Sequence, residues 1–400
     1  MMARRELQLR IAVVSGDDVV GKDPEQLCAA LAAQGHDATV CLRRAGQRSV
    51  QAAAEGSYRF VSAAIGPRRA APSVEVLPYV GAWAAKLERA WSKEPPDVVH
   101  AYGWLAGLAA QLAARRRRIP VVQTFLGLAA TSRGQAVAEH NSERLRVEPL
   151  LARSAAWVTG ESSDDVDVLA RLRRSRARVS ALTCGVDSSR YAPAGPGAPR
   201  NGLQRVLCVT PNPLQYNGID IAIRALPKVR GAELVIAEND ATNGGHNDAR
   251  SRLRHLAVEL DVGDRVRFAG TVSDDELPKL IRSVDVAVCT PRQPPRATAV
   301  LQAMATGMAV AAATVGVLAD VVLDDITGLM VPPENPIALA AALRRLLGQS
   351  FHCESMGAAG RSRAMSRFPW ERIALDALNI YESIGSADTA PTGLRSAAAR

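Results

Sequence analysis

Short apolar runs along the chain alternate with amphipathic stretches of helical period, which is typical of βα units. The first unit has an apolar run at 10–15, a helical stretch over about 24–34 and a second apolar run at 37–43. Pro24 suits the first turn of that helix, and Gly35 suits its end. A strand, a helix and a strand within about 30 residues predict parallel pairing with a right-handed crossover.

The same alternation predicts strands throughout both halves of the chain. In the first half we expect strands at 96–102, 119–126, 155–161 and 178–187, with a helix over 103–118. In the second half we expect strands at 204–211, 232–238, 264–270, 284–291 and 307–313. These units predict an α/β fold of two doubly wound parallel-sheet domains of the Rossmann-like kind.

A Gly- and Pro-rich stretch, AGPGAPRNG, marks a linker between the two domains. We predict a first domain over 1–195, a linker over 196–203 and a second domain over 204–369. A helix is expected over 370–385, and the tail at 386–400 lacks an apolar period and is predicted to be disordered. The length of 400 residues suits two domains better than one compact core.

The composition is that of a globular protein with a basic surplus. With 48% hydrophobic and 22% charged residues, the chain is not of the disordered, collagen-like or disulfide-scaffold classes. The formal net charge is +9, and 44 of the 49 basic residues are arginines. This surplus fits either a phosphate-rich partner or solvated surface faces. Nucleic acid is not an expected partner, because only 4% of residues are aromatic and no stacking motif interleaves with the arginines.

The cysteines and the termini favour a cytoplasmic protein. The six cysteines are spread without a CxxC pair or a Cys/His pair at ligand spacing, which predicts reduced thiols and no metal site. The N-terminus has no apolar stretch long enough for a signal peptide. The uncharged stretch 297–319 is rich in Ala, Thr and Gly, so we expect a helix, a glycine turn and a buried strand there rather than a membrane span.

Several collinear segments carry a family resemblance. The segments PDVVHAYGWLAGLAA, IPVVQTF, LQAMATGMAV and DDITGLMVPP resemble retaining GT-B glycosyltransferases, over about residues 10–384. The likeness is to a large actinobacterial branch that uses nucleotide-diphospho-sugars. It implies two domains facing a cleft, with the donor site in the second domain, the acceptor site in the first and a C-terminal helix crossing back. The implied reaction is metal-independent hexose transfer with retention, with the nucleotide-sugar as co-substrate and no cofactor.

The donor positions implied by the resemblance have changed residue type. Asn212 and Asn217 stand where the family has the Arg and the Lys that hold the diphosphate, just before Gly218. Pro294 and Gln302 stand where the family has two glutamates that read the sugar and the ribose. Asparagine donates hydrogen bonds but carries no charge, and charge-assisted bonds are roughly twice as strong as neutral ones. The resemblance therefore implies a degenerate active site, and we assign no catalytic residue.

Three other cations are candidates to replace the missing pair. Arg292 and Arg296 lie in the donor loop CTPRQPPRAT, and Lys22 lies in the first loop of the first domain. The alternative is that all three are solvated surface residues. The resemblance also places Gly270 and Thr271 beside the nucleotide base, through backbone groups.

The acceptor side departs from the family pattern as well. Leu126 stands in the place of a family histidine beside the reacting sugar, and the first loop is shortened but keeps Gly16. Lys22 and Arg146 are the candidate acceptor-side cations, since an arginine at the place of Arg146 contacts an acceptor phosphate in relatives. The alternative for Arg146 is a solvated helix face with i,i+4 ion pairs.

Two functional hypotheses follow from these positions. The first is a working glycosyltransferase with a rebuilt donor site and an unidentified small-molecule or lipid acceptor. The second is a catalytically impaired relative that binds a nucleotide or sugar, or that partners an active glycosyltransferase. The arginine clusters at 115–118 and 171–178 add the alternative of peripheral contact with anionic lipid headgroups.

Overall fold

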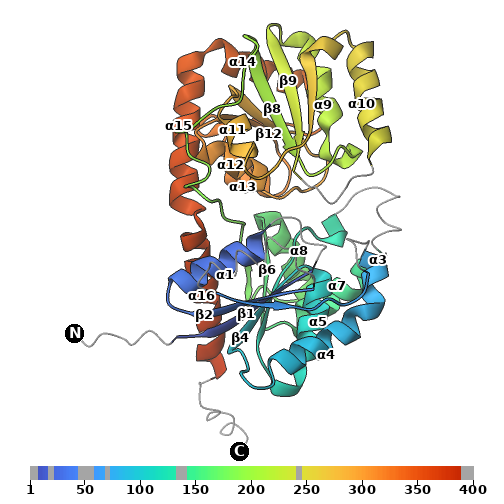
Figure 1. The fold of residues 1–400 in the computed structure, drawn as a ribbon, viewed down its shortest axis with the longest axis vertical. Coiled ribbons are helices and arrows are strands. Elements are labelled where there is room, and N and C mark those ends of the chain that lie inside the picture. The colour runs from blue at the N-terminus through green and yellow to red at the C-terminus, as the bar shows by residue number, and fades with distance from the viewer. Residues whose placement is uncertain are drawn as a thin grey trace, which may run out of the picture.

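The computed structural model describes residues 8–16, 22–43, 58–67, 73–131, 142–239 and 246–388. Within these ranges the chain forms two α/β domains, each built on one parallel sheet (Figure 1). The first sheet has seven strands in the order β3-β2-β1-β4-β5-β6-β7, and the second has six in the order β10-β9-β8-β11-β12-β13. The predicted fold class, with two doubly wound parallel-sheet domains, is confirmed.

The strands coincide with the apolar runs of the sequence. The first sheet contains β1 (Arg10–Ser15), β2 (Asp37–Leu42), β3 (Arg59–Ser62), β4 (Val98–Tyr102), β5 (Val121–Thr124), β6 (Trp157–Gly160) and β7 (Val179–Ala181). The second contains β8 (Gln204–Thr210), β9 (Ala232–Glu238), β10 (Val266–Thr271), β11 (Val286–Cys289), β12 (Ala309–Ala313) and β13 (Gly328–Val331). Two edge strands, β3 and β13, were not predicted.

Helices cover both faces of each sheet. The first domain has α1 (Asp23–Ala33), α3 (Ser73–Val76), α4 (Val80–Ala90), α5 (Trp104–Ala114), α7 (Ser142–Ser154) and α8 (Ser163–Arg173). The second has α9 (Ile219–Ala225), α10 (Asn247–Glu259), α11 (Leu277–Ile281), α12 (Thr298–Ala305), α13 (Val317–Val321), α14 (Pro336–Gly348) and α15 (Ser350–Arg367). The uncharged stretch forms α12, a turn at Gly307 and the buried β12, as expected. No described helix is long and apolar enough to span a membrane.

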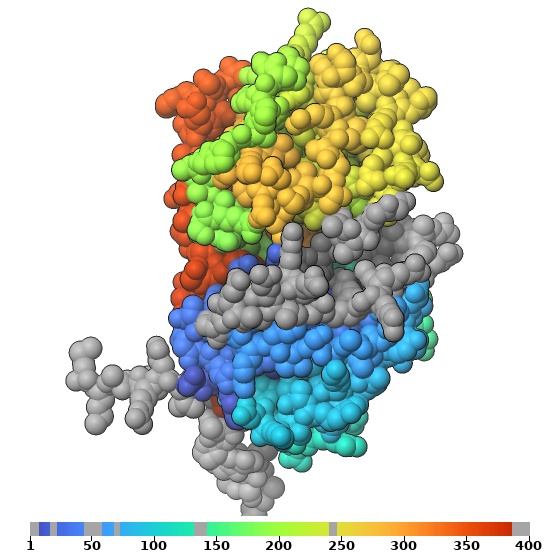
Figure 2. Space-filling model, in the orientation of Figure 1, coloured from blue at the N-terminus to red at the C-terminus, as the bar shows by residue number. Residues whose placement is uncertain are grey.

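The last helix, α16 (Trp370–Asp388), leaves the second domain and lies on the first (Figure 1). It packs against α1, and the side-chain amide of Gln34 donates to the Glu371 carbonyl at 2.9 Å. Figure 2 shows the C-terminal helices along one side of both domains. The helix extends to Asp388, three residues into the segment predicted as a disordered tail, and the remainder of that tail is outside the described ranges.

A buried polar chain fastens α16 to the first sheet. The Nδ1 of His100 lies 2.6 Å from the Tyr381 hydroxyl, and its Nε2 lies 2.6 Å from the Oγ1 of Thr124, which in turn lies 2.6 Å from the Oγ1 of Thr159. Burial lowers the pKa of His100 to about 3, so the imidazole is neutral at physiological pH. Because the unfolded imidazole takes up a proton below about 6.5, the contribution of His100 to stability declines as the pH falls from there towards 3.

The mutation Tyr381→Phe is expected to lower the free energy of unfolding by about 1–3 kcal/mol, because it leaves a buried imidazole nitrogen without its partner. Urea denaturation with Tyr79→Phe as the control checks this, since Tyr79 is 46% exposed. Equal stability of the two variants would contradict a structural role for the chain of hydrogen bonds.

Candidate functional site

A cavity of about 420 Å³ lies between the two domains, at the carboxyl ends of their strands. The strand orders reverse between β1 and β4 in one sheet and between β8 and β11 in the other, which is where open α/β sheets bind ligands. The first domain and the segment after β7 contribute Lys22, Asp23, Leu126, Asp187 and Arg190, and the second contributes Thr210, Asn217, Asn239, Asp274, Thr290, Arg296 and Gln302. The volume suits a drug-sized or sugar-sized ligand.

The predicted site residues divide into two groups. Those that line the cavity are Lys22, Asn217, Arg296 and Gln302, together with Leu126 and Pro294. Those that are not among the lining residues are Gly16, Arg146, Asn212, Gly218, Gly270, Thr271 and Arg292. Arg146 is exposed on α7, as the solvated-face alternative expects.

Asn212 and Asn217 bond mainly within their own loop. The Nδ2 of Asn217 donates to the backbone carbonyl and to the Oδ1 of Asn212, at 2.9 Å each. The Nδ2 of Asn212 donates to the Tyr216 hydroxyl at 2.9 Å, and its Oδ1 accepts from the Leu214 amide at 3.2 Å. The pair therefore shapes the loop between β8 and α9 and brings no positive charge to it.

Arg292 has a structural partner rather than a place in the cavity wall. Its guanidinium forms a bidentate ion pair with Asp220 at 2.7 and 2.8 Å and donates to the Gln215 carbonyl at 2.8 Å. The hydrogen bonds that Arg292 donates to the Asp220 carboxylate raise the pKa of Arg292, against partial burial, which lowers it. The interaction fastens the loop after β11 to the first turn of α9.

Arg296 points across the domain boundary to two carboxylates of the first domain. Its Nη2 pairs with Asp23, the first residue of α1, and lies 3.2 Å from the Oε1 of Glu161. Glu161 is fixed in the turn between β6 and α8, because Ser162 and Asp165 form a capping box directly after it. Asp23 and Glu161 were not singled out from the sequence, although Glu161 ends the predicted strand 155–161.

Burial dominates the electrostatics of this cluster. It raises the pKa of Glu161 to about 7, although the Arg296 charge acts in the opposite direction. It also raises the pKa of Asp23, again against the Arg296 charge. For Arg296 itself, burial disfavours the cation, but Asp23 and Glu161 outweigh burial and raise its pKa. Arg296 thus stays charged, while Glu161 titrates near neutrality.

Two more polar contacts join the domains beside the cavity. The Nζ of Lys22 lies 2.7 Å from the Oδ2 of Asp274, and both side chains are about half exposed. At the start of α8, the amide and hydroxyl of Ser163 donate to the carboxylate of Asp320 at 2.7 and 2.8 Å. Exposed pairs of this kind contribute about 1 kcal/mol or less.

The second-domain wall of the cavity presents acceptors without partners. The Oε1 of Gln302 and the Oδ1 of Asn239 are buried and accept no hydrogen bond from the described residues. Both residues line the cavity, Asn239 directly after β9 and Gln302 on α12. Buried acceptors are normally satisfied, so this wall is suited to a ligand that brings hydroxyl or amino donors.

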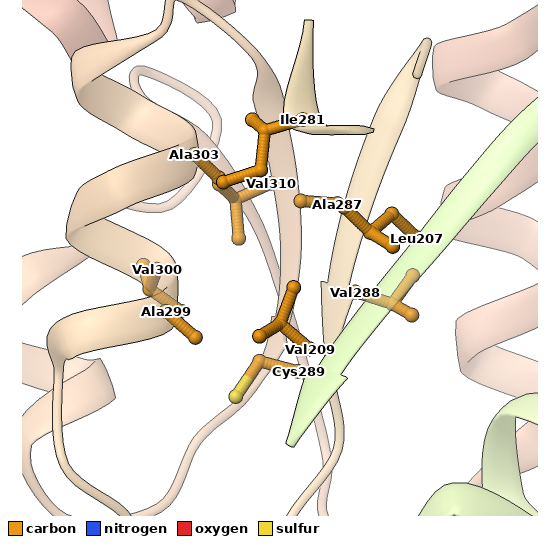
Figure 3. A pocket seen from close by; sticks show the side chains of 10 residues that line it. All are labelled: Leu207, Val209, Ile281, Ala287, Val288, Cys289, Ala299, Val300, Ala303 and Val310. Carbon is orange, nitrogen blue, oxygen red and sulfur yellow. The ribbon is translucent and has the colours of Figure 1, made fainter. Parts of the chain in front are cut away.

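A second, much smaller space lies inside the second domain (Figure 3). Its volume is about 10 Å³, and apolar side chains such as Leu207, Ile281 and Val310 line it together with Cys289. A space of this size holds about one water molecule, so it is a packing gap and not a ligand site. Among the described residues there is also no group of three or more metal-ligating side chains that would hold a metal ion.

The two parallel-sheet domains and the cavity at their strand ends define a GT-B architecture, and the comparisons agree. The family described as "Glycosyl transferases group 1" matches residues 199–363, and the one described as "Glycosyltransferase Family 4" matches residues 25–190. The two models together match most of the chain, which therefore belongs to the glycosyltransferases.

Curated relatives carry different names. A D-inositol 3-phosphate glycosyltransferase of Salinispora tropica is 29% identical over 306 residues, which are 71% of this chain and 63% of that protein. This chain thus spans less than two thirds of that relative. A glycogen synthase of Mycobacterium tuberculosis is 28% identical over 387 residues, which are 90% of each protein.

Solved structures share the fold over nearly the whole chain. The sucrose-phosphate synthase of Thermosynechococcus elongatus has a TM-score of 0.81 at 22% identity, covering 95% of this chain and 100% of that one. HepE of Anabaena, in complex with UDP and glucose, has a TM-score of 0.75 at 18% identity, covering 94% and 100%.

Proposed function

We propose that the protein transfers a hexose from a nucleotide-diphospho-sugar to a small-molecule or lipid acceptor, with retention of anomeric configuration and without a metal ion. The observation that carries the proposal is the cavity of about 420 Å³ that both domains line. Its second-domain wall offers to sugar or ribose hydroxyls the side-chain oxygens of Gln302 and Asn239, which accept no hydrogen bond from any described residue. The UDP and glucose of the HepE complex support a donor of this class.

The chemistry asks the protein mainly to stabilise a departing nucleoside diphosphate. The bond between the anomeric carbon and the diphosphate oxygen breaks, the acceptor oxygen forms the new bond to that carbon, and the proton of the acceptor hydroxyl passes to the departing diphosphate. Fixed cations aimed at the departing oxygens lower the barrier to this step. Lys22 and Arg296 are the candidate cations in the cavity wall, and Gln302 is the candidate that orients the donor by accepting from a hydroxyl group.

One set of observations favours the alternative of binding without turnover. Each cation of the described cavity wall has a carboxylate partner: Lys22 pairs with Asp274, Arg190 with Asp275, and Arg296 with Asp23. Leu126 also brings an alkyl group to the position of the family histidine. In this alternative the protein binds a nucleotide-sugar and either regulates or partners an active transferase.

Purified protein with radiolabelled UDP-, GDP- and ADP-glucose distinguishes the two functions. We offer inositol 3-phosphate, glycogen and a lipid extract as acceptors, because the names of the relatives include a cyclitol phosphate and a polysaccharide. Transfer of label to one of them is expected. Saturable binding without any labelled product would support the alternative, and neither binding nor transfer would refute both.

Gln302→Leu is expected to weaken donor binding about tenfold, because it removes the amide that would accept from the ligand. Gln349→Leu is the control, since Gln349 is exposed between α14 and α15, away from the cavity. Calorimetric titration with the donor that the protein binds measures the difference. An unchanged dissociation constant in Gln302→Leu would remove Gln302 from the proposed site.

A further inference from the structure

We propose that Arg296 is the diphosphate-binding cation of this chain, and that Asp23 and Glu161 hold it in a donor-free arrangement from which the diphosphate releases it. The inference rests on the proposed function and adds a mechanism of access to it. In this arrangement the carboxylates of the first domain occupy the guanidinium that the donor needs. Donor binding is then an exchange of partners at Arg296, and the exchange loosens one of the contacts between the domains.

The position of Arg296 supports this role. It lines the cavity in the loop between β11 and α12, together with Pro294 and Gln302. Its side chain is 22% exposed, so it is accessible from the cavity although its carboxylate partners are buried. The planar guanidinium also matches two phosphate oxygens at once.

The site has few other sources of positive charge. The asparagine pair in the loop after β8 is neutral, and Pro294 and Pro295 have no backbone N–H to offer a phosphate. Of the other two cations in the described wall, Lys22 pairs with Asp274 and Arg190 pairs with Asp275. Arg296 is the least exposed of the three cations in the described wall, so a diphosphate that enters the cavity gains most from pairing with it.

The charge balance of the cluster makes the exchange feasible. Asp23, Glu161 and Arg296 together carry one net negative charge when all three are ionised. Two buried carboxylates share one guanidinium, so one of them is incompletely neutralised, and the surplus charge repels a phosphate from the same place. Removing the charge of either carboxylate should weaken this repulsion and leave Arg296 more available to the donor.

The groups around Glu161 also predict a dependence on pH. Arg296 and Asp23 face it from across the boundary and from α1, the carboxylate of Asp165 accepts from its backbone amide at 3.2 Å, and the buried thiol of Cys184 lies within its electrostatic reach. Burial raises the pKa of Glu161 to about 7, so Glu161 is mostly neutral at pH 6 and mostly ionised at pH 8. Donor affinity should therefore rise as the pH falls from 8 to 6.

Calorimetric titration of the full chain with intact UDP-, GDP- and ADP-glucose tests the exchange, since the diphosphate diester of these donors does not titrate between pH 6 and 8. At pH 8, Glu161→Gln and Asp23→Asn should each bind the preferred donor more tightly, by up to about tenfold. Arg296→Ala should bind it about tenfold or more weakly. Between pH 8 and pH 6 the wild-type affinity should increase severalfold, and Glu161→Gln should lose this dependence. Glu148→Gln is the matched control, because Glu148 is a buried carboxylate that pairs with Arg144 at 2.7 Å, outside the cavity wall.

The direction of the effects separates the exchange from a structural role. If the carboxylates only hold the domains together, their neutral variants will bind the donor as tightly as wild type or more weakly, and the proposal is overturned. Donor binding by wild type that Arg296→Ala leaves unchanged also overturns it, while the proposed function stands. Absence of binding by wild type to all three donors refutes the proposed function and this inference with it.

Discussion

Gly218→Ala is expected to destabilise the protein by about 3 kcal/mol and to weaken donor binding, because no side chain fits at this position. Gly218 has a φ of +66°, and a Cβ added to it would lie 1.8 Å from the backbone carbonyl oxygen of Thr290. The hydroxyl of Thr290 donates to the Gly218 carbonyl at 2.9 Å, so the two loops touch backbone to backbone. The methyl group of an alanine would push the two loops apart, and with them the ends of β8 and β11 that form part of the cavity wall.

Gly231 offers a matched control for this prediction. It has a φ of +74°, but a Cβ added to it would meet nothing within 4 Å beyond its own chain neighbours. Gly231→Ala therefore carries only the conformational cost of a left-handed residue, about 1 kcal/mol. Urea denaturation of both variants measures the difference, and equal losses would show that the contact with Thr290 does not determine the stability of the loop.

The alternation of apolar runs was sufficient to predict the fold, because a buried parallel strand needs a continuous apolar segment and its crossover helix needs an amphipathic one. The same criterion fails for β3 and β13. The segment RFVS has only two apolar residues and GLMV has three, whereas the equally short β5, β6 and β11 lie within longer predicted runs. Pairing with β2 and β12 makes the two segments strands. Tertiary contacts supply what these local patterns lack.

The sequence predicted a cleft between the two domains, but it did not predict the ion pairs that the structure shows there. Arg292 and Arg296 lie four residues apart in one loop, and nothing in their local sequence distinguishes them. In the structure, Arg292 forms an ion pair with Asp220 on α9, and Arg296 forms ion pairs with carboxylates of the first domain. The partner of Arg292 follows from how the second domain folds, and those of Arg296 follow from how the two domains meet; residue spacing encodes neither.

Asn212 and Asn217 also show which features of the site can be predicted from sequence and which cannot. The sequence predicted that the charge of the family cations is lost at Asn212 and Asn217, and the neutral side chains follow from residue identity alone. It did not predict that the two amides bond to each other, because this depends on the turn that the intervening residues adopt. Because this loop offers no cation, a replacement has to come from elsewhere in the cavity wall, where Lys22 and Arg296 are the candidates.

Glu233→Ala is expected to lower the free energy of unfolding by about 3–5 kcal/mol, because it leaves the Arg205 guanidinium buried without a counter-charge. The two residues face each other in register on β8 and β9, with 2.5 Å between Nε and Oε1, and both are almost fully buried. Arg205 also donates to the Ser283 hydroxyl at 2.8 Å and to the Pro199 carbonyl at 2.9 Å, so it ties the predicted linker segment to the second sheet.

Two comparisons separate the effect of an unpaired buried charge from the effect of lost packing. Glu94→Ala removes a partner of Arg59 that is 64% exposed, and should cost about 1 kcal/mol or less. The double variant Arg205→Met with Glu233→Leu removes both charges while keeping the volume filled, and should recover most of the stability lost by Glu233→Ala. Urea denaturation measures all three. If the double variant, which carries no buried charge here, is as unstable as Glu233→Ala, an unpaired buried charge does not account for the loss.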